Sequence, residues 1–326
     1  MQQFVERMWY QGHKAAWLLL PLAWLYAAIT ALRRLMFRFA ITKQHRVAAP
    51  VIVVGNISVG GTGKTPFTLA LCKLLQQQGW QPGIISRGYG AEITKPTLVA
   101  ADGLAEAFGD EPLLLAQRSG CPVVVCPDRV AAARFLLANT PCNIVISDDG
   151  LQHYRLARDV EIVLIDGVRG LGNGLLIPAG PLREGKWRLD TVNLVVANSK
   201  AFPGADGVMQ LKAAAAVTLK GAKVLPAGSE VSLVAGIGNP QRFVQTVQTA
   251  GIAVAGKYFF PDHHHFCVED FKNIAGPVLM TDKDAVKCLS FSQDDWYRLP
   301  VEAEFDVQLN IKLNTILANL RSSYGN

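Results

Sequence analysis

The chain alternates short apolar runs with amphipathic stretches, which is the pattern of a sheet whose strands are joined by helices. Between residues 47 and 203, the apolar runs predict strands at Val51–Val54, Gly83–Ser86, Pro122–Val125, Asn143–Ser147, Glu161–Ile165 and Val192–Ala197. Helices are predicted over Thr65–Gln78, Glu111–Arg118 and Arg129–Asn139. This alternation predicts an α/β fold, a doubly wound and mostly parallel sheet with its chemistry at the carboxyl ends of the strands.

After about residue 203 the alternation starts again on a smaller scale. Strands are predicted at Ser232–Ala235, Gly256–Phe260 and Val278–Thr281, with a helix ending at Ala250 and an amphipathic stretch near Leu313–Leu320. We therefore predict a hydrophobic and basic segment at 1–46, a larger α/β domain at 47–203 and a smaller α/β domain at 204–326. The last helix is in a position to pack back on the larger domain.

Charge is distributed unevenly along the chain. Seven of the 32 basic residues but only one of the 26 acidic residues lie in 1–46, so the rest of the chain carries 25 of each sign. A neutral body with a basic, apolar front end favours an anionic membrane surface over nucleic acid as a partner. The six cysteines form no Cys-x-x-Cys pair, which favours reduced thiols in a cytosolic chain. No obligate protein partner is indicated.

The basic front end contains an uncharged stretch at residues 15–32, flanked by Lys14 and by Arg33-Arg34. Its length is the lower limit for a helix that spans a bilayer. A cleaved signal peptide fits poorly, because no small-x-small site follows and the basic cluster lies on the wrong side. Basic residues at both ends do not orient a spanning helix. An interfacial helix fits best, since Trp17, Trp24 and Tyr26 suit the headgroup region. An ordinary buried helix is the remaining alternative.

The strongest chemical signal is a glycine-rich turn that follows the predicted strand at 51–54. Residues 55–66 read Gly-Asn-Ile-Ser-Val-Gly-Gly-Thr-Gly-Lys-Thr-Pro, and a predicted helix comes next. In such a turn backbone N–H groups converge on phosphate oxygens, Lys64 reaches the β/γ phosphates, and the Thr65 hydroxyl can hold Mg²⁺. The common P-loop pattern has glycine at position 58, where this chain has Ser58. The strand, turn and helix together predict a P-loop nucleotide site.

A second part of this site is predicted at Asp148-Asp149. The two carboxylates follow the predicted strand at 143–147, and a P-loop enzyme needs an acid there to hold Mg²⁺ or its waters. Adjacent carboxylates repel each other unless a cation lies nearby. We expect one of them to contact the metal sphere and the other to orient a neighbour. A surface Asp-Asp-Gly turn is the alternative.

The ordered motifs of the chain resemble those of the tetraacyldisaccharide 4′-kinase family of lipid A biosynthesis. The resemblance extends from the N-terminal apolar helix to near residue 290. It is carried by Asn56-x-Ser58 through Pro66, Ser86-Arg87-Gly88-Tyr89-Gly90, Gly109-Asp110-Glu111-Pro112, Asp128-Arg129, Asp148-Asp149-Gly150-x-Gln152-His153, Pro178 to Glu184, Phe260-Pro261-Asp262-His263-His264 and Thr281-x-Lys283-Asp284-Ala285-Val286-Lys287.

The resemblance implies that the ATP γ-phosphate is transferred to the 4′-hydroxyl of a tetraacylated glucosamine disaccharide 1-phosphate. This reaction would take place on the cytoplasmic face of a Gram-negative inner membrane. It implies that Asp110 is the base for the sugar hydroxyl, paired with a histidine of the second domain that we assign as His263. The implied cofactor site comprises Gly60, Gly61, Thr62, Gly63, Lys64, Thr65 and Pro66, with Thr65, Asp148 and Asp149 at Mg²⁺. The implied substrate contacts are Asn56, Ser58, Arg87, Tyr89, Glu111, Arg129, Gln152 and His153.

Several of these roles have simpler alternatives on the residues alone. On the residues alone, capping of the helix that Pro112 would begin is the better explanation of Asp110 and Glu111. The three histidines at 263–265 could form an exposed loop, and alternation along an extended segment prevents all three from facing one metal ion. Arg87 and Arg129 suit phosphate, but surface ion pairs would explain them as well.

Another function class is also compatible with the P-loop. A membrane-associated switch ATPase that positions partner proteins has a similar motif, but usually with a lysine just before the Gly-Gly pair, where this chain has Val59. A GTPase is disfavoured because Asn198-Ser-Lys200 has no aspartate at its end. A kinase makes a phosphorylated lipid, whereas a switch ATPase releases free phosphate.

Overall fold

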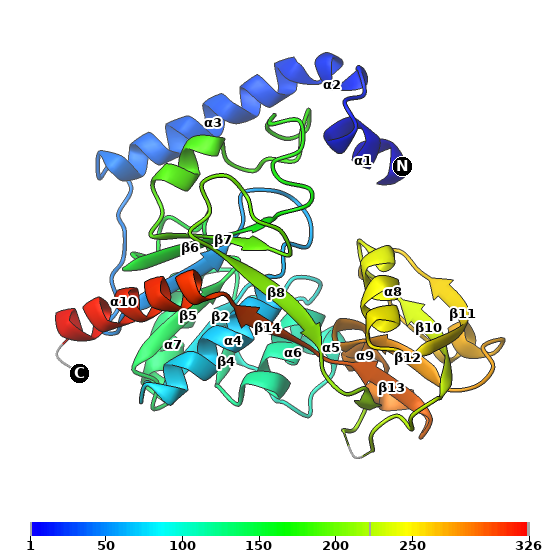
Figure 1. Cartoon of the computed structure of the whole chain (residues 1–326). Coiled ribbons are helices and arrows are strands. Elements are labelled where there is room, and N and C mark those ends of the chain that lie inside the picture. The colour runs from blue at the N-terminus through cyan, green and yellow to red at the C-terminus, as the bar shows by residue number, and fades with distance from the viewer. Residues whose placement is uncertain (1, 222, 325–326) are drawn as a thin grey trace.

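The protein forms two separate sheets (Figure 1). The structure is a computed structural model that describes residues 2–221 and 223–324. The larger sheet has nine strands in the order β14-β8-β7-β6-β1-β5-β2-β4-β3. Their bounds are β1 Val51–Gly55, β2 Pro82–Ser86, β3 Thr97–Leu98, β4 Val123–Val125, β5 Ile144–Asp148, β6 Val160–Asp166, β7 Leu194–Asn198, β8 Gly207–Ala213 and β14 Val301–Phe305.

Helices cover both faces of this sheet, as the apolar pattern predicts. They are α4 (Lys64–Gln77), α5 (Ala105–Phe108), α6 (Asp110–Ser119), α7 (Arg129–Asn139) and α10 (Val307–Tyr324). Phe67, Leu71, Leu113 and Leu313 belong to the core on one face, and Val130 and Leu136 belong to the core on the other. The doubly wound α/β class is confirmed. All six predicted strands of this part and its three predicted helices are present, with bounds that differ by at most two residues.

Strand order places the glycine-rich turn beside the two aspartates. β1 lies between β5 and β6 and is parallel to both, with Val54 opposite Asp148 in the register. Parallel strands that start at the same edge also end at the same edge, so the turn after β1 and the residues after β5 meet. β7 ends at the same edge with Asn198, because its register pairs Asp166 with Asn198.

The smaller sheet has five strands in the order β11-β10-β12-β13-β9. Its elements are β9 Val217–Thr218, β10 Glu230–Ala235, β11 Ala253–Phe259, β12 Val278–Thr281, β13 Trp296–Leu299, α8 Pro240–Thr249 and α9 Asp282–Cys288. Short 3₁₀ turns lie at η1 Lys186–Asp190, η2 Val268–Phe271 and η3 Leu289–Phe291. The strands predicted at 232–235, 256–260 and 278–281 are all present.

The chain leaves the larger sheet through β8 and returns to it through β14. These two strands pair antiparallel, from Val301 opposite Ala213 to Phe305 opposite Met209. The sequence pattern did not predict either strand. α10 then packs on this part of the larger sheet, where Leu309 and Leu313 are buried. The division of the chain at residue 203 stays a prediction. Segments from both sides of residue 203 contribute strands to the larger sheet and share one core.

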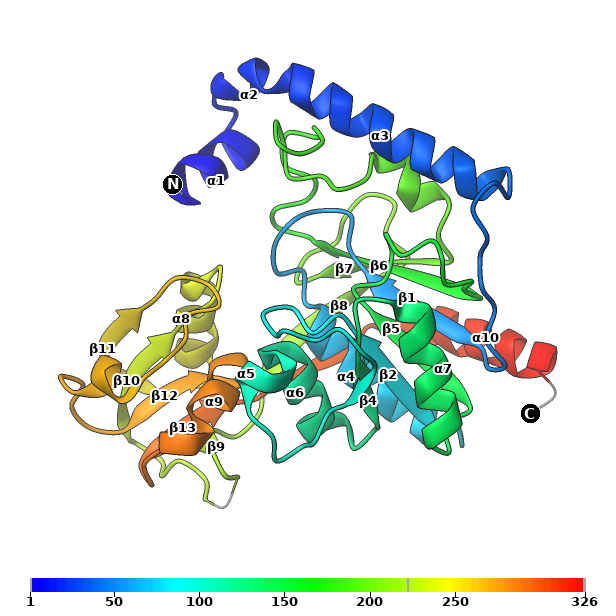
Figure 2. The same ribbon diagram turned by 180° about the vertical axis from the view of Figure 1, so that it is seen from behind.

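The N-terminal segment forms α1 (Gln2–Tyr10), α2 (Ala15–Leu18) and α3 (Leu20–Arg38), with Pro21 in the first turn of α3. α3 runs along one end of the larger domain, away from the smaller sheet (Figures 1 and 2). Within the described residues, it is the helix that is long and apolar enough to cross a membrane by length and composition, and only 6% of it is buried. The buried-helix alternative is therefore wrong.

Candidate functional site

The glycine-rich turn after β1 is a compact backbone cradle held by two asparagines. The Asn56 side-chain amide donates to the Gly60 carbonyl at 3.2 Å, and the Asn198 amide donates to the Thr62 carbonyl at 3.0 Å. Gly63 has a φ of 91°, and a Cβ there would lie 2.5 Å from the Asn198 Nδ2 atom. A larger residue is therefore excluded at the start of α4. Gly60 and Gly61 remain exposed, so backbone amides of the turn are open to a phosphate.

Lys64 lies on the first turn of α4 and faces the end of β5. Its Nζ atom is 3.7 Å from Oδ1 of Asp149. Arg183 holds the same carboxylate, with Nη1 3.0 and 3.2 Å from its two oxygens. Burial would raise the pKa of Asp149, but these two cations outweigh it and lower that pKa. The P-loop lysine, the second aspartate and an arginine from the 178–184 motif thus form one charged cluster.

Asp148 is the last residue of β5 and is only 2% exposed. Burial, with a contribution from the nearby Glu111 carboxylate, raises its pKa to about 7. Its Oδ1 atom has no hydrogen-bond partner among the described residues, and neither does the buried Thr62 hydroxyl. An unpartnered buried carboxylate oxygen beside a phosphate cradle fits a Mg²⁺ ion or one of its waters, since Mg²⁺ is usually held by one or two carboxylates plus phosphates. Thr65 follows Lys64 in α4 and is half-buried.

At a second point, the Asp110 carboxylate at the start of α6 meets His263 from the loop after β11. The Asp110 Oδ2 atom is 3.1 Å from Nδ1 of His263, and Oδ1 of Asp110 accepts from the Glu111 backbone N–H at 2.9 Å. Burial would raise the pKa of Asp110, but the His263 hydrogen bond and nearby lysines outweigh it and lower that pKa. The same hydrogen bond raises the pKa of His263, against burial and Lys283. The structure therefore brings together the two residues that we assigned as a pair.

The three consecutive histidines have different surroundings. His263 faces Asp110, whereas Nε2 of His264 lies 2.9 Å from Asp270 and its ring stacks on Phe260. His265 is exposed. His263 itself has a φ of 60° and its ring lies 5.2 Å from the Tyr89 ring. Across residues 2–221 and 223–324, no three His, Cys, Asp or Glu side chains are grouped as metal ligands.

Two lysines of α9 surround the Asp110–His263 pair. Lys283 Nζ donates to Oε1 of Glu111 at 3.2 Å and lies 3.3 Å from Nε2 of His263. Lys287 Nζ lies 3.9 Å from Asp110 and donates to the buried Asp284 at 2.8 Å. Glu111 was assigned as a substrate contact, and here it binds a lysine of the smaller domain.

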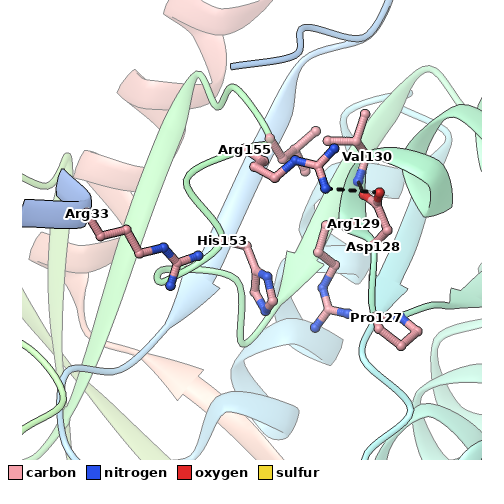
Figure 3. Close-up of a pocket in the computed structure, with 8 residues that line it drawn as sticks. Arg33, Pro127, Asp128, Arg129, Val130, His153 and Arg155 are labelled. Carbon is pink, nitrogen blue, oxygen red and sulfur yellow. Dashed lines mark hydrogen bonds and ion pairs between the residues drawn. The ribbon is translucent and has the colours of Figure 1, made fainter. Parts of the chain in front are cut away.

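A basic pocket opens between α3, α7 and the loop after β5 (Figure 3). Arg33, Arg129 and His153 point into it, and Arg155 pairs with Asp128 at 3.3 Å on its rim. The lining holds three arginines and one carboxylate, so its net positive charge suits an anionic group.

The two assigned residues at the base of this pocket are not free surface groups. Arg129 is buried and donates to the carbonyls of Cys126 at 2.8 Å and Asp148 at 3.4 Å, and burial lowers its pKa to about 10. Burial and the nearby arginines lower the pKa of His153 to about 4, so its ring is neutral at pH 7. The surface ion pair suggested as an alternative for Arg129 is therefore wrong. Arg87 is exposed beside this region, and Tyr89 is exposed near His263.

Gln152 and Ser58 lie in the framework between the pocket and the cradle. Gln152 donates to the buried Glu184 at 2.6 Å and to the Asn56 carbonyl at 3.4 Å, and Glu184 also accepts from the Tyr154 hydroxyl at 2.5 Å. Ser58 is buried and bridges to Leu182. The Tyr154 ring in turn contacts Phe37 and Arg33 of α3. These contacts link the N-terminal helix to the glycine-rich turn.

Sequence reasoning missed several residues that hold the site together. Three of them belong to motifs that carry the family resemblance: Arg183, Glu184 and Lys283. Their positions in that ordered set of motifs are the signal that could have identified them. Arg242 of α8 gave no signal, yet it donates to Oδ1 of Asn198 at 3.0 Å and so supports the cradle from the smaller domain.

Comparison with known proteins agrees with this geometry. Residues 15–318 match the model of a family described as tetraacyldisaccharide-1-P 4′-kinase. A tetraacyldisaccharide 4′-kinase of Shewanella sp. (strain MR-7) is 46% identical over 98% of this chain and 97% of its own. One of Shewanella baltica (strain OS195) is 45% identical over 99% of both chains. A crystal structure of LpxK from Aquifex aeolicus in complex with ATP superimposes with a TM-score of 0.80 at 26% identity, covering 94% of this chain and 99% of that one.

Proposed function

Because this chain belongs to the tetraacyldisaccharide-1-P 4′-kinase family, we propose that it transfers the ATP γ-phosphate to the 4′-hydroxyl of a tetraacyl glucosamine disaccharide 1-phosphate. It is thus a kinase of lipid A biosynthesis and a phosphotransferase with an alcohol acceptor. The Asp110–His263 contact of 3.1 Å carries this proposal, since a phosphate cradle alone would fit any P-loop ATPase. A carboxylate with a histidine partner supplies the proton acceptor that an alcohol needs.

The cradle residues bind the triphosphate. Backbone amides from Gly60 to Thr65 face the phosphate oxygens, and Lys64 neutralises charge at the β and γ positions. ATP binding is supported by the ATP complex of the structural relative. Thr65, Asp148 and Asp149 would hold Mg²⁺, with the unpartnered Oδ1 of Asp148 as the observation that favours it. When bound, Mg²⁺ would add to the neutralisation of phosphate charge.

Asp110 acts on the acceptor. Its carboxylate accepts the proton of the 4′-hydroxyl as that oxygen bonds to the γ-phosphorus, and the bond from the γ-phosphorus to the β–γ bridging oxygen breaks to leave ADP. His263 orients the carboxylate through its Nδ1 atom. The nearby Glu111 contributes to the raised pKa of Asp148, which indicates that the base and the metal corner share one neighbourhood.

The basic pocket suits the anionic end of the acceptor. Arg33, Arg129 and Arg155 line it, and Arg87 lies beside it, so a sugar phosphate would find several positive partners there. We assign the exposed Tyr89 ring to stacking on a sugar. Asn56, Ser58, Gln152 and His153 act by shaping the loops between pocket and cradle, because their bonds or burial leave them inside the framework.

We further propose that α3 lies in the surface of the membrane, on the cytoplasmic face of the bacterial inner membrane. Its inner face is fixed to the body by the Tyr26 hydroxyl, which donates to the Arg183 carbonyl at 3.0 Å, and by Arg34 over Trp187. Its outer face exposes a row of apolar side chains at helical spacing: Leu22, Leu25, Ile29 and Leu32. A helix fixed along the body with one apolar face outward is typical of an interfacial helix.

Replacing Trp17, Leu18, Trp24 and Leu25 together by serine is expected to lower binding to anionic lipid vesicles by about 10²-fold or more. These side chains are 58–83% exposed, so the change removes membrane contacts without opening the core. Co-sedimentation with vesicles measures the loss. A control protein with Leu98, Val224, Val307 and Ile311 changed to serine should bind as the unaltered protein does. Equal vesicle binding by both variants would contradict the interfacial helix.

ATP turnover with and without the acceptor lipid tests the function. A kinase is expected to consume ATP in proportion to the phosphorylated lipid formed, with little free phosphate. Turnover that proceeds equally without acceptor and releases phosphate would instead support the switch ATPase. The position before the Gly-Gly pair favours the kinase, since Val59 supplies no charge there.

A further inference from the structure

Lys283 lies on the first turn of α9 and places its ammonium group at the edge of the His263 ring. Its Nζ atom is 3.3 Å from Nε2 of His263 and 3.2 Å from Oε1 of Glu111. It is also 3.8 Å from Oδ2 of Asp110 and 3.7 Å from Oδ1 of Asp262. The side chain is only 20% exposed, so the ammonium group meets these acceptors largely shielded from solvent.

The position of Lys283 is fixed by the start of α9. The Thr281 hydroxyl accepts from the Asp284 backbone N–H at 3.2 Å and donates to the Asp284 carboxylate at 2.7 Å. Asp282 pairs with Arg118 of α6 and accepts from Arg298 at 2.9 Å. α9 is therefore bonded both to its own sheet and to the helix that begins with Asp110. Lys283 is held against the pair by these contacts.

The chemistry of the ammonium group determines which ring nitrogen carries a proton. Lysine has donors and no acceptor, so the nitrogen that faces it at hydrogen-bond distance presents its lone pair. With Nε2 unprotonated, the neutral ring carries its proton on Nδ1, the atom that faces Asp110. We propose that Lys283 is a positioning residue that holds His263 as the Nδ1–H tautomer, so that the ring donates to Asp110 and takes up a second proton less readily.

This inference rests on the proposed role of Asp110 as proton acceptor. A neutral ring orients the carboxylate while leaving it basic. A second proton on Nε2 would turn the ring into a cation, which binds the carboxylate more tightly and makes it a poorer base. The charged and titratable groups around His263 are Asp110 and Glu111 from α6, Lys283 and Lys287 from α9, Asp262 from its own loop, and Tyr89 from the loop after β2.

The sign of the pH effect follows from these surroundings. The hydrogen bond with Asp110 is the largest influence and raises the pKa of His263 above its usual value, while burial and the positive charge of Lys283 keep it from rising further. Removing the lysine charge therefore raises that pKa further, so more of the ring is protonated at any given pH. If activity requires the neutral ring, the acidic limb of the rate profile moves to higher pH.

Histidine nitrogen chemical shifts test the tautomer directly. The full-length protein, labelled with ¹⁵N in its six histidines, is titrated through the neutral range as unaltered protein, Lys283→Met, Lys283→Arg and the exposed control Lys272→Met. We expect a protonated Nδ1 and an unprotonated Nε2 in the unaltered, Lys283→Arg and Lys272→Met proteins. In Lys283→Met we expect a mixture of tautomers and a titration midpoint higher by about one unit. Lys283→Gln serves as a second neutral variant if Lys283→Met does not fold.

Kinetics on the same proteins separate this inference from the proposed function. We expect Lys283→Met to lower kcat about tenfold at neutral pH, with the acidic limb of its profile moved upward and KM for ATP unchanged. Lys283→Arg should restore most of the rate. Unaltered tautomer and midpoint in Lys283→Met would overturn the inference whatever the activity. If the tautomer changes in Lys283→Met but the acidic limb of its rate profile does not move, the positioning role of Lys283 stands. The role of Asp110 as the base is then contradicted.

Discussion

Replacing Asp110 by asparagine is expected to lower kcat by about 10²–10⁴-fold while leaving ATP binding unchanged. The amide has nearly the same shape but cannot accept the proton of the sugar hydroxyl. The start of α6 should persist, since the side-chain oxygen can still accept from the Glu111 backbone N–H. Rapid-quench measurement of the phosphorylated lipid gives kcat, and calorimetric titration gives the nucleotide affinity.

The exposed Asp102 provides the matched control for this change, because Asp102→Asn removes an equivalent carboxylate from the turn before α5. Asp102→Asn should retain the full rate. An Asp110→Asn protein within about threefold of the unaltered rate would remove this carboxylate from proton transfer. Reduced ATP affinity in that protein would mean that Asp110 acts at the nucleotide rather than at the acceptor.

Replacing Lys64 by alanine is expected to lower kcat/KM for ATP by about 10²–10³-fold and to weaken nucleotide binding as well. The ammonium group is the one side-chain cation on the glycine-rich turn, and no neighbouring residue of that turn can replace its charge. Stability should change little, because Asp149 keeps its two bonds with Arg183. Titration with a fluorescent nucleotide measures the nucleotide affinity, and a thermal melting curve measures the stability.

Lys73 on the same helix is exposed and offers the control for the charge change. Lys73→Ala should bind and transfer as the unaltered protein does. Loss of folding in Lys64→Ala, or normal nucleotide affinity with a lowered rate, would disagree with a cradle in which this lysine holds the triphosphate. Lys64→Ala and Asp110→Asn should thus differ: the first loses binding and rate, and the second loses rate alone.

Local sequence was sufficient for the elements that form the nucleotide corner. A strand at 51–54 followed by the glycine-rich turn predicts the course of β1 and α4, because phosphate cradles depend on backbone geometry that glycine permits. The helix predicted at Arg129–Asn139 has the same bounds as α7, since Asp128 caps it through the Val130 and Ala131 N–H groups. Asp148 and Asp149 follow β5 as expected.

The contacts that complete the site depend on tertiary structure. Arg183 reaches Asp149 from 34 positions away along the chain, and Asn198 reaches Thr62 from 136. Neither pair has a local pattern, because the register of several strands and the path of the intervening loops bring them together. β8 and β14 were missed for the same reason: the pairing of Ala213 with Val301 joins segments separated by the whole smaller sheet.

A structure with Mg²⁺, a non-hydrolysable ATP analogue and the tetraacyldisaccharide 1-phosphate would test the central claim most directly. The measurement is the position of the acceptor 4′-oxygen relative to Asp110 and to the γ-phosphorus. We predict that this oxygen lies within about 3 Å of an Asp110 carboxylate oxygen and in line with the γ-phosphate held at Lys64. A triphosphate bound elsewhere, or a 4′-oxygen that faces neither group, would contradict the account.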